Sequence, residues 1–331
     1  MLVGFFSRFP QNRFWVLVEA ALGVVGFMSF CIVSGADQKY FAPLTDLLKS
    51  LEGFRRHLAI LDFGLTPAQI SHLEDLGIAV VGFTYPHDYK ARLQVERSFP
   101  GFGAMLARPY LNEIFPTYET LMWMDADTWV HDLSAVTEII EQASHHGLAA
   151  IPEVDRNYVK FSSAGKHIWE AERNTYKRCF GIENANRMAL LPVINSGVWA
   201  ARSSSPLWAA WRALLQQGLA HLESIDDESR IVEQAAFNLA IESAQLGVRR
   251  FPATYNWMVS CAIPAWHVHK QALVDPHPPH DEIKIVHLST HFLSRPLALP
   301  LIGHTRSGIH ATLRRSDILQ LREVLAKSLS A

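Results

Sequence analysis

The sequence lacks a surplus of charge of either sign. Its 331 residues hold 30 Lys and Arg against 32 Asp and Glu, which gives a formal net charge of −2. This balance gives no reason to expect nucleic acid as a partner, because binding a phosphate backbone needs a basic patch or stripe. A charged ligand must therefore be met by a local site.

Cysteine is also scarce. The three cysteines, Cys31, Cys179 and Cys261, are far apart and odd in number. They form neither a disulfide framework nor the spacing of a zinc knuckle, so a reducing compartment is favoured and we predict a cytoplasmic protein. The apolar share of 49% and charged share of 19% are typical of a folded globular chain.

A long uninterrupted apolar run is missing as well. The best candidate, Phe14 to Val33, is broken by Glu19, Ser29 and two glycines. Since the segment from Phe27 on resembles a first strand, about 13 residues of apolar helix remain, fewer than the ~20 that span a bilayer. We predict that residues 1–27 form a docked helix, with peripheral membrane contact as the alternative, because Glu19 adds a further cost to insertion.

Strand and helix patterns alternate through the first half of the chain. Strands are predicted at Met28–Ser34, Leu58–Asp62, Ile78–Phe83, Glu119–Met124 and Leu148–Pro152. Helical patterns lie between them at Tyr40–Leu51, after the Thr66-Pro67 cap, and at Arg108–Phe115. This alternation predicts an α/β fold with a mostly parallel sheet.

The alternation weakens after about residue 152. Helices are predicted at Ser205–Leu222, Arg230–Gly247 and Ser316–Ser328, and a late strand at Ile283–His287. We therefore divide residues 28–300 into two halves, 28–152 and 153–300. Residues 301–331 are predicted to be a C-terminal helical extension.

Two acidic residues end the fourth predicted strand. The apolar run Leu121–Met124 is followed by Asp125 and Asp127. Carboxylates this close repel each other unless a cation lies between them, and a divalent ion held in this way suits a diphosphate ligand. An isolated pair could be an ordinary acidic turn. However, ligands of open parallel sheets bind where strands end, and Asp37 also follows a predicted strand.

Several segments resemble, in the same order, those of glycosyltransferase family 8, the group of glycogenin and the bacterial lipooligosaccharide galactosyltransferases. They are Ser34–Tyr40, Arg108–Phe115, Glu119–Val130, Val193–Val198, Glu233–Asn238, Tyr255–Trp257 and Ile285–His287. The resemblance implies the GT-A fold and a nucleotide-sugar donor, usually UDP-linked. It also implies transfer of a hexose, with retention at the anomeric carbon, to a glycan, lipid-linked glycan or protein acceptor.

The resemblance implies roles for individual residues. Asp125, Asp127 and His287 would be the metal ligands, a mixed oxygen and nitrogen set that suits Mn²⁺, with Mg²⁺ as the alternative. Gln234, with Glu233 beside it, would face the anomeric carbon. The residues expected to bind the donor are Ser34, Asp37, Tyr40, Arg108, Asp125, Asn195, Gly197 and Arg295.

The residues expected to bind the nucleotide-sugar donor would have different roles. Asp37 and Tyr40 would hold and stack on the uracil. Arg108 would pair with a phosphate or an acidic neighbour, and Arg295 with the β-phosphate. Asn195 would hydrogen-bond sugar hydroxyls, while Gly197 lets the backbone approach closely. For each, an ordinary structural position is the alternative: a surface ion pair, a solvated loop or a strand turn.

The sequence departs from the family pattern in three ways. Glu233 and Ala235 stand where relatives carry two aspartates. The segment after His287 is two residues longer than usual and lacks its glycine. Arg295 also replaces a lysine. These departures leave the donor sugar and the closure of the diphosphate loop open.

Two other functions compete with the transferase. A haloacid-dehalogenase-like phosphatase also has D-x-D after an apolar strand, but its motif needs Thr or Val where Trp129 stands. A nucleotide-sugar-binding protein without turnover is the second alternative, suggested by Ala235. The histidine pairs His267/His269 and His277/His280 are predicted to be loop residues rather than metal ligands.

Overall fold

A computed structural model describes residues 29–85, 102–162, 165–222, 231–289, 292–304 and 308–329. The predicted helix over residues 1–27 lies outside these ranges, as does Met28. Among the helices of the described ranges, none combines the length and the apolar character needed to cross a membrane.

A seven-stranded sheet forms the centre, with the strand order β3-β2-β1-β4-β7-β6-β8. Its strands are β1 Phe30–Ala36, β2 Leu58–Asp62, β3 Ala79–Gly82, β4 Thr120–Met124, β6 Leu148–Pro152, β7 Ile194–Arg202 and β8 Arg249–Arg250. Strand β7 is antiparallel to both of its neighbours, and the other pairs are parallel. The predicted α/β fold with a mostly parallel sheet is confirmed.

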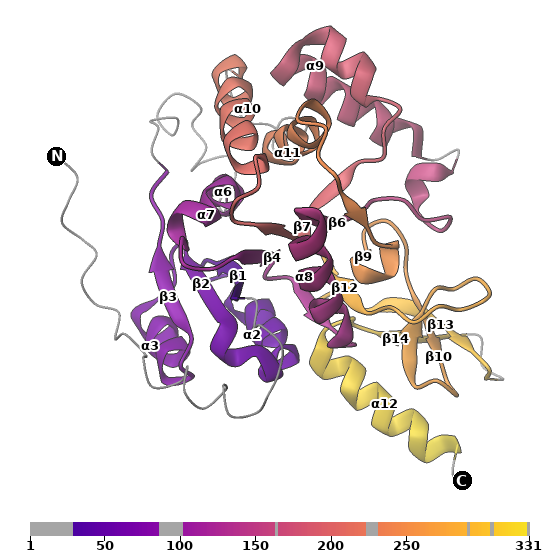
Figure 1. The fold of residues 1–331 in the computed structure, drawn as a ribbon. Helices are drawn as coiled ribbons and strands as arrows, with labels where there is room; N and C mark the ends of the chain where they lie inside the picture. The colour runs from indigo at the N-terminus through magenta and orange to yellow at the C-terminus, as the bar shows by residue number, and fades with distance from the viewer. Residues whose placement is uncertain are drawn as a thin grey trace.

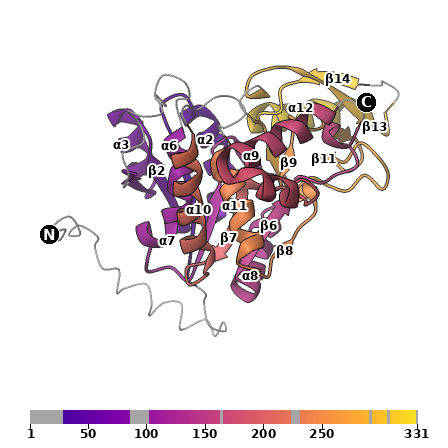
Figure 2. The ribbon, with the colours of Figure 1, turned by 90° about the horizontal axis from the view of Figure 1, so that it is seen from above.

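Helices cover both faces of this sheet (Figures 1 and 2). One layer consists of α6 Phe102–Ala107, α7 Leu111–Ile114, α9 Lys166–Met188, α10 Leu207–His221 and α11 Val232–Ser243. The other consists of α2 Phe41–Ser50, α3 Pro67–Asp75 and α8 Ser134–His146. Along β1, Cys31 and Val33 pack toward the first layer and Ile32 toward the second. Burial on both faces explains why the strands are nearly continuous apolar runs.

Most predicted elements occur within a few residues of their expected bounds. Strands β2 and β6 have the predicted ends, and α3 begins at the predicted cap, where Thr66 and Gln69 form a capping box. Strand β1 extends through Gly35 and Ala36, two residues beyond the predicted end at Ser34. Helix α11 ends at Ser243, four residues before the predicted Gly247.

The predicted helix Arg108–Phe115 is wrong as a single helix. The chain forms α6, then a 3-10 turn, η3 Arg108–Tyr110, and then the short α7. Pro109 explains the break, because it lacks an N–H and restricts the residue before it. The break leaves the Arg108 side chain buried beneath the site.

Two smaller sheets are formed mostly by the second half of the chain. The first contains β5 Thr128–Val130, β9 Trp257–Met258 and β12 Ile285–His287. The second contains β10 Ala265–His267, β11 Ala272–Val274, β13 Leu297–Ile302 and β14 Gly308–Ala311. Helix α12, Arg315–Leu329, and the 3-10 turns η2 Glu52–His57, η4 Val159–Phe161 and η6 Ala253–Tyr255 complete the described elements. The division into domains stays a prediction, and β13 runs across residue 300.

Candidate functional site

The two aspartates lie where β4 gives way to β5. Strand β4 is buried throughout and ends at Met124, and the turn that follows is closed by the Thr128 backbone N–H, which donates to the Asp125 carbonyl at 3.0 Å. The Asp125 N–H donates to the Gly197 carbonyl of β7 at 2.8 Å. The apolar strand therefore carries both carboxylates to the edge of the sheet, as the sequence predicts.

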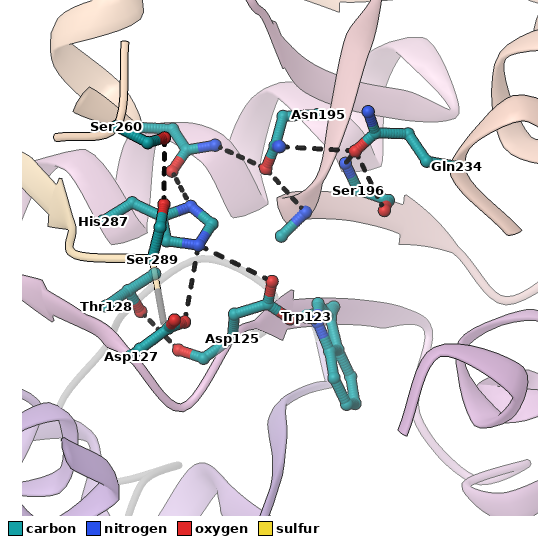
Figure 3. Close-up of polar contacts among 12 residues, drawn as sticks. Trp123, Asp125, Asp127, Thr128, Asn195, Ser196, Gln234, Ser260, His287 and Ser289 are labelled. Carbon is teal, nitrogen blue, oxygen red and sulfur yellow. Dashed lines mark hydrogen bonds and ion pairs between the residues drawn. The ribbon is translucent and has the colours of Figure 1, made fainter. Parts of the chain in front are cut away.

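His287 meets the acidic pair because β12 pairs with β5. His287 lies opposite Thr128 in this antiparallel register. Its Nε2 is 3.4 Å from Asp127 Oδ1 and 3.8 Å from Asp125 Oδ2 (Figure 3). One ligand atom from each of the three residues lies within 4.8 Å of the others. The three predicted metal ligands thus converge, although about 160 residues separate His287 from the pair.

The chemistry of this group fits a divalent cation. His287 Nδ1 forms a hydrogen bond with Asn256 Oδ1 at 3.0 Å. The other ring nitrogen, Nε2, therefore has its lone pair available on the side that faces the carboxylates. Burial alone would lower the pKa of His287, but the charges of Asp127 and Asp125 outweigh it and raise the pKa. A positive charge is therefore favoured between these groups, and a bound cation would supply it.

Gly197 forms one wall of the cation site. A Cβ atom at this position would lie 2.6 Å from Asp125 Oδ2 and 2.6 Å from His287 Cε1. Side chains do not approach this closely, so any larger residue must push the ligands apart. The glycine is required by the packing of the ligands.

We expect Gly197→Ala to weaken Mn²⁺ binding by more than ~10-fold, because it displaces two ligands that must meet one ion. It should also lower the free energy of unfolding by about 1–3 kcal/mol through overpacking. Titration of Mn²⁺ against the purified variant measures the first effect. Gly82→Ala is the matched control, since nothing lies within 4 Å of a Cβ there. Equal Mn²⁺ affinity in both variants would contradict the assignment.

Arg108 joins two acidic residues beneath the pocket. Its Nη1 donates to Glu233 Oε2 at 2.6 Å and to Ser196 Oγ at 2.9 Å, and its Nη2 donates to Asp125 Oδ1. The guanidinium also lies 5.2 Å from the centroid of Trp123, whose Nε1 donates to Asp125 Oδ1 at 2.7 Å. Of the two predicted partners, a phosphate or an acidic neighbour, the structure shows acidic neighbours.

Glu233 is a buried carboxyl with an unsatisfied oxygen. Burial raises the pKa of Glu233 to about 7, and Arg108 and Ser196 offset only part of this effect. Its Oε1 has no hydrogen-bond partner within the described part of the chain. Glu233 therefore lines the pocket with a carboxyl group whose unpaired oxygen is itself buried and whose pKa lies near neutral pH.

Gln234 and Asn195 are held by a carboxylate that the sequence analysis did not identify. Glu153 Oε1 accepts hydrogen bonds from Asn195 Nδ2 at 2.9 Å and Gln234 Nε2 at 3.1 Å. Gln234 Oε1 accepts one from the Ser196 N–H at 3.0 Å. Glu153 directly follows strand β6, so the rule that sites gather at strand ends could have identified it.

Asp37 and Tyr40 also line the pocket. Asp37 Oδ1 accepts hydrogen bonds from the backbone N–H groups of Lys39 and Tyr40, both at 2.9 Å, at the start of α2. Phe63, also missed in the sequence, packs on Gly35, where a Cβ would lie 2.4 Å from Phe63 Cε2. An aromatic ring beside a polar strand end can contact a planar base.

One pocket of about 350 Å³ unites most of the predicted residues. Its lining includes Asp37, Tyr40, Arg108, Asp125, Asp127, Asn195, Gly197, Glu233, Gln234 and His287. Two predicted residues lie outside the lining: Ser34 is buried within β1, and Arg295 is exposed before β13.

The other histidine pairs do not form a metal site in the part of the chain that the structure describes. His267 Nδ1 accepts the Lys270 N–H at 3.2 Å, so its proton lies on Nε2. His269, His277 and His280 lie in turns or loops, as predicted, but His267 ends strand β10, so the loop prediction is wrong for His267.

Of the comparisons with known proteins, the one with solved structures finds matches. No model of a known protein family matches the sequence, and a search of curated proteins finds no relative. Among solved structures, the galactosyltransferase LgtC in complex with donor and acceptor sugar analogues matches with a TM-score of 0.50. It is 15% identical over 88% of this chain and 95% of its own. Mouse xyloside xylosyltransferase 1 matches with a TM-score of 0.44 at 13% identity, over 80% of this chain and 98% of its own.

At these identities the likeness concerns the fold alone. The chain has the GT-A fold, and the fold implied by the family 8 resemblance is confirmed. The match to LgtC extends over most of both chains.

Proposed function

We propose that this protein is a metal-dependent glycosyltransferase that moves a hexose from a UDP-linked donor to an acceptor, with retention at the anomeric carbon. The observation that carries the proposal is the convergence of Asp125, Asp127 and His287 at the edge of a pocket in a GT-A fold. A phosphatase of the haloacid-dehalogenase type would not account for the histidine.

Asp125, Asp127 and His287 would hold Mn²⁺ or Mg²⁺, which when bound neutralises the charge of a departing diphosphate. Arg108 pairs with Asp125 and fixes its direction. Gly197 keeps open the space in which the ligands meet. These residues together prepare one wall of the pocket for an anion.

The donor sugar would lie between Asn195, Glu233 and Gln234. The Gln234 amide is held by Glu153 and by the Ser196 backbone, so it is fixed before a ligand binds. Glu233 Oε1 is buried and has no partner in the described structure, so the side chain would have to turn toward the pocket to bond a sugar hydroxyl. We assign to Gln234 the position facing the anomeric carbon.

The nucleoside would bind at the other end, against Asp37, Tyr40 and Phe63. Tyr40 and Phe63 offer rings to a uracil, and Asp37 offers its second carboxylate oxygen. Ser34 and Arg295 remain predictions, because neither lines the pocket in this structure. The acceptor would be a glycan, a lipid-linked glycan or a protein.

The test is release of free UDP from a panel of UDP-hexoses, measured with Mn²⁺ and again with EDTA. A transferase releases UDP only with the cation, and NMR of the glycoside formed reports retention. A binding protein without turnover would take up the donor and release no UDP. That outcome would replace the proposed activity by the competing one.

The affinity for Mn²⁺ should depend on pH. The pKa of His287 is raised above its ordinary 6.5 by Asp127 and Asp125, and a protonated imidazole cannot bind a metal. Affinity should therefore fall as the pH decreases through this raised pKa, that is, from above pH 6.5 downward. Calorimetric titrations with Mn²⁺ between about pH 8 and about pH 6 would show the loss. In His287→Gln the dependence should flatten, and an equally steep decline in the variant would contradict the assignment.

A further inference from the structure

A chain of hydrogen bonds connects the proposed cation site to the sugar side of the pocket. Asn256, which is 2% exposed, follows η6 and lies at its centre. Its Oδ1 is 3.0 Å from His287 Nδ1, and its Nδ2 donates to Asn195 Oδ1 at 2.9 Å. Asn195 Nδ2 in turn donates to Glu153 Oε1 at 2.9 Å.

The direction of every hydrogen bond in this series follows from the Glu153 carboxylate at its end. A carboxylate only accepts hydrogen bonds, so Glu153 requires the Asn195 Nδ2 to point toward it. Asn195 Oδ1 then accepts from Asn256 Nδ2 and from the Gly197 N–H, at 2.9 and 2.8 Å. Asn256 is left with its Oδ1 toward His287, and an amide oxygen can only accept.

His287 must therefore carry its proton on Nδ1. The remaining nitrogen, Nε2, has a lone pair and lies 3.4 Å from Asp127 Oδ1. A metal-binding histidine is commonly fixed by a hydrogen bond from its other nitrogen, and losing that partner lowers metal affinity by about 10–100-fold.

We propose that Asn256 is a positioning residue that fixes the tautomer and ring orientation of His287 and links the cation site to the sugar pocket through Asn195. The proposal rests on the proposed function for the identity of the cation. The link means that a ligand which moves Asn195 alters the support of His287.

The backbone around Asn256 is held independently of its side chain. The Tyr158 hydroxyl accepts the Met258 N–H at 3.1 Å, and β9 pairs with β12 on the other side. The Val259 N–H donates to the His287 carbonyl at 2.9 Å. Side-chain variants of Asn256 should therefore keep the path of the chain.

Two substitutions distinguish the effect of the Asn256 hydrogen-bond acceptor from the effect of the size of its side chain. Asn256→Leu is similar in size and removes both hydrogen bonds. Asn256→Asp keeps an oxygen toward His287 Nδ1 but replaces the donor to Asn195. We expect Asn256→Leu to weaken Mn²⁺ binding about 10–100-fold, measured by calorimetry without nucleotide, and Asn256→Asp to remain within about 10-fold of wild type.

The tautomer supplies a readout that a merely structural role would not change. In ¹⁵N NMR above the pKa of His287, the wild type and Asn256→Asp should show the proton on Nδ1, and Asn256→Leu a mixture of tautomers. Asn238→Ala is the control: Asn238 is also buried, but its hydrogen bonds go to Ile194 and Gln234. It should lose stability and keep both the tautomer and the Mn²⁺ affinity.

The proposal is overturned if Asn256→Leu keeps the Nδ1–H tautomer and the Mn²⁺ affinity of the wild type. If the wild type itself binds no Mn²⁺, the proposed function fails. The NMR comparison then still decides whether Asn256 fixes His287, so the two failures are distinguishable.

Discussion

Asp127→Asn should abolish Mn²⁺ binding and donor turnover while the protein stays folded. The substitution removes a negative charge from the ligand set and keeps the size of the side chain. We expect a loss of Mn²⁺ affinity of more than ~100-fold, beyond what the loss of a supporting hydrogen bond produces. The free energy of unfolding should change by less than ~1 kcal/mol, because the repulsion between two neighbouring carboxylates is relieved. Calorimetry and thermal unfolding measure the two quantities.

Asp125→Asn should have the same effect on Mn²⁺ with an added loss of stability, since Asp125 also pairs with Arg108. Asp127 is therefore the cleaner test. Asp281→Asn, at an exposed aspartate near β12, is the matched control and should change neither quantity. If Asp127→Asn keeps near-native turnover, the metal site is wrongly assigned.

Arg108→Met should be the most destabilising single substitution in the pocket. It leaves Glu233, 1% exposed, without the cation that compensates its burial. Breaking a buried ion pair by removing one partner typically lowers the free energy of unfolding by about 3–5 kcal/mol. Chemical denaturation at constant pH measures this change. Donor turnover should be lost as well, because Asp125 loses its direction.

The stability lost in Arg108→Met should depend on pH in a defined direction. The pKa of Glu233 is already raised from 4.5 to about 7, and removing Arg108 raises it further. A buried acid with a raised pKa destabilises the fold once the unfolded chain can ionise, that is, above 4.5. In the wild type this destabilisation stops growing near pH 7, where the folded protein also ionises Glu233, whereas in Arg108→Met it continues. The defect relative to the wild type should therefore be small up to about pH 7 and grow as the pH rises above it.

Two further variants isolate the ion pair. Arg108→Met combined with Glu233→Leu should recover much of the stability and none of the turnover, because the carboxyl group of Glu233 is no longer buried without its cation. Arg55→Ala removes an arginine from an exposed pair with Glu52 and should change the free energy of unfolding by less than about 1 kcal/mol. If Arg108→Met changed the free energy of unfolding by as little as Arg55→Ala, the buried network would not stabilise the fold.

The sheet and the acidic pair could be predicted from local sequence. Buried parallel strands are apolar over their whole length, so β2 and β6 stand out from their surroundings. Asp125 and Asp127 interrupt such a run and mark the edge of the sheet. The position of His287 depends instead on the pairing of β12 with β5. Only the family resemblance indicated that His287 belongs to the site.

The supporting residues could not be found in this way. Asn256 and Glu153 act through hydrogen bonds across 31 to 81 residues of sequence, and no periodic pattern encodes such contacts. Helix α9 was missed because few of its side chains are buried, which leaves no clear apolar stripe. The strands of the four-stranded sheet were missed because most have only three or four residues.

Binding of UDP, measured by calorimetry first with Mn²⁺ and then with EDTA, tests the central claim most directly. The claim is that Asp125, Asp127 and His287 hold a cation that receives the diphosphate. We predict one UDP bound per chain with Mn²⁺ and a loss of binding of more than ~100-fold in EDTA, since an acidic pair without its cation repels a diphosphate. Equal affinity for UDP in the two conditions would contradict the account.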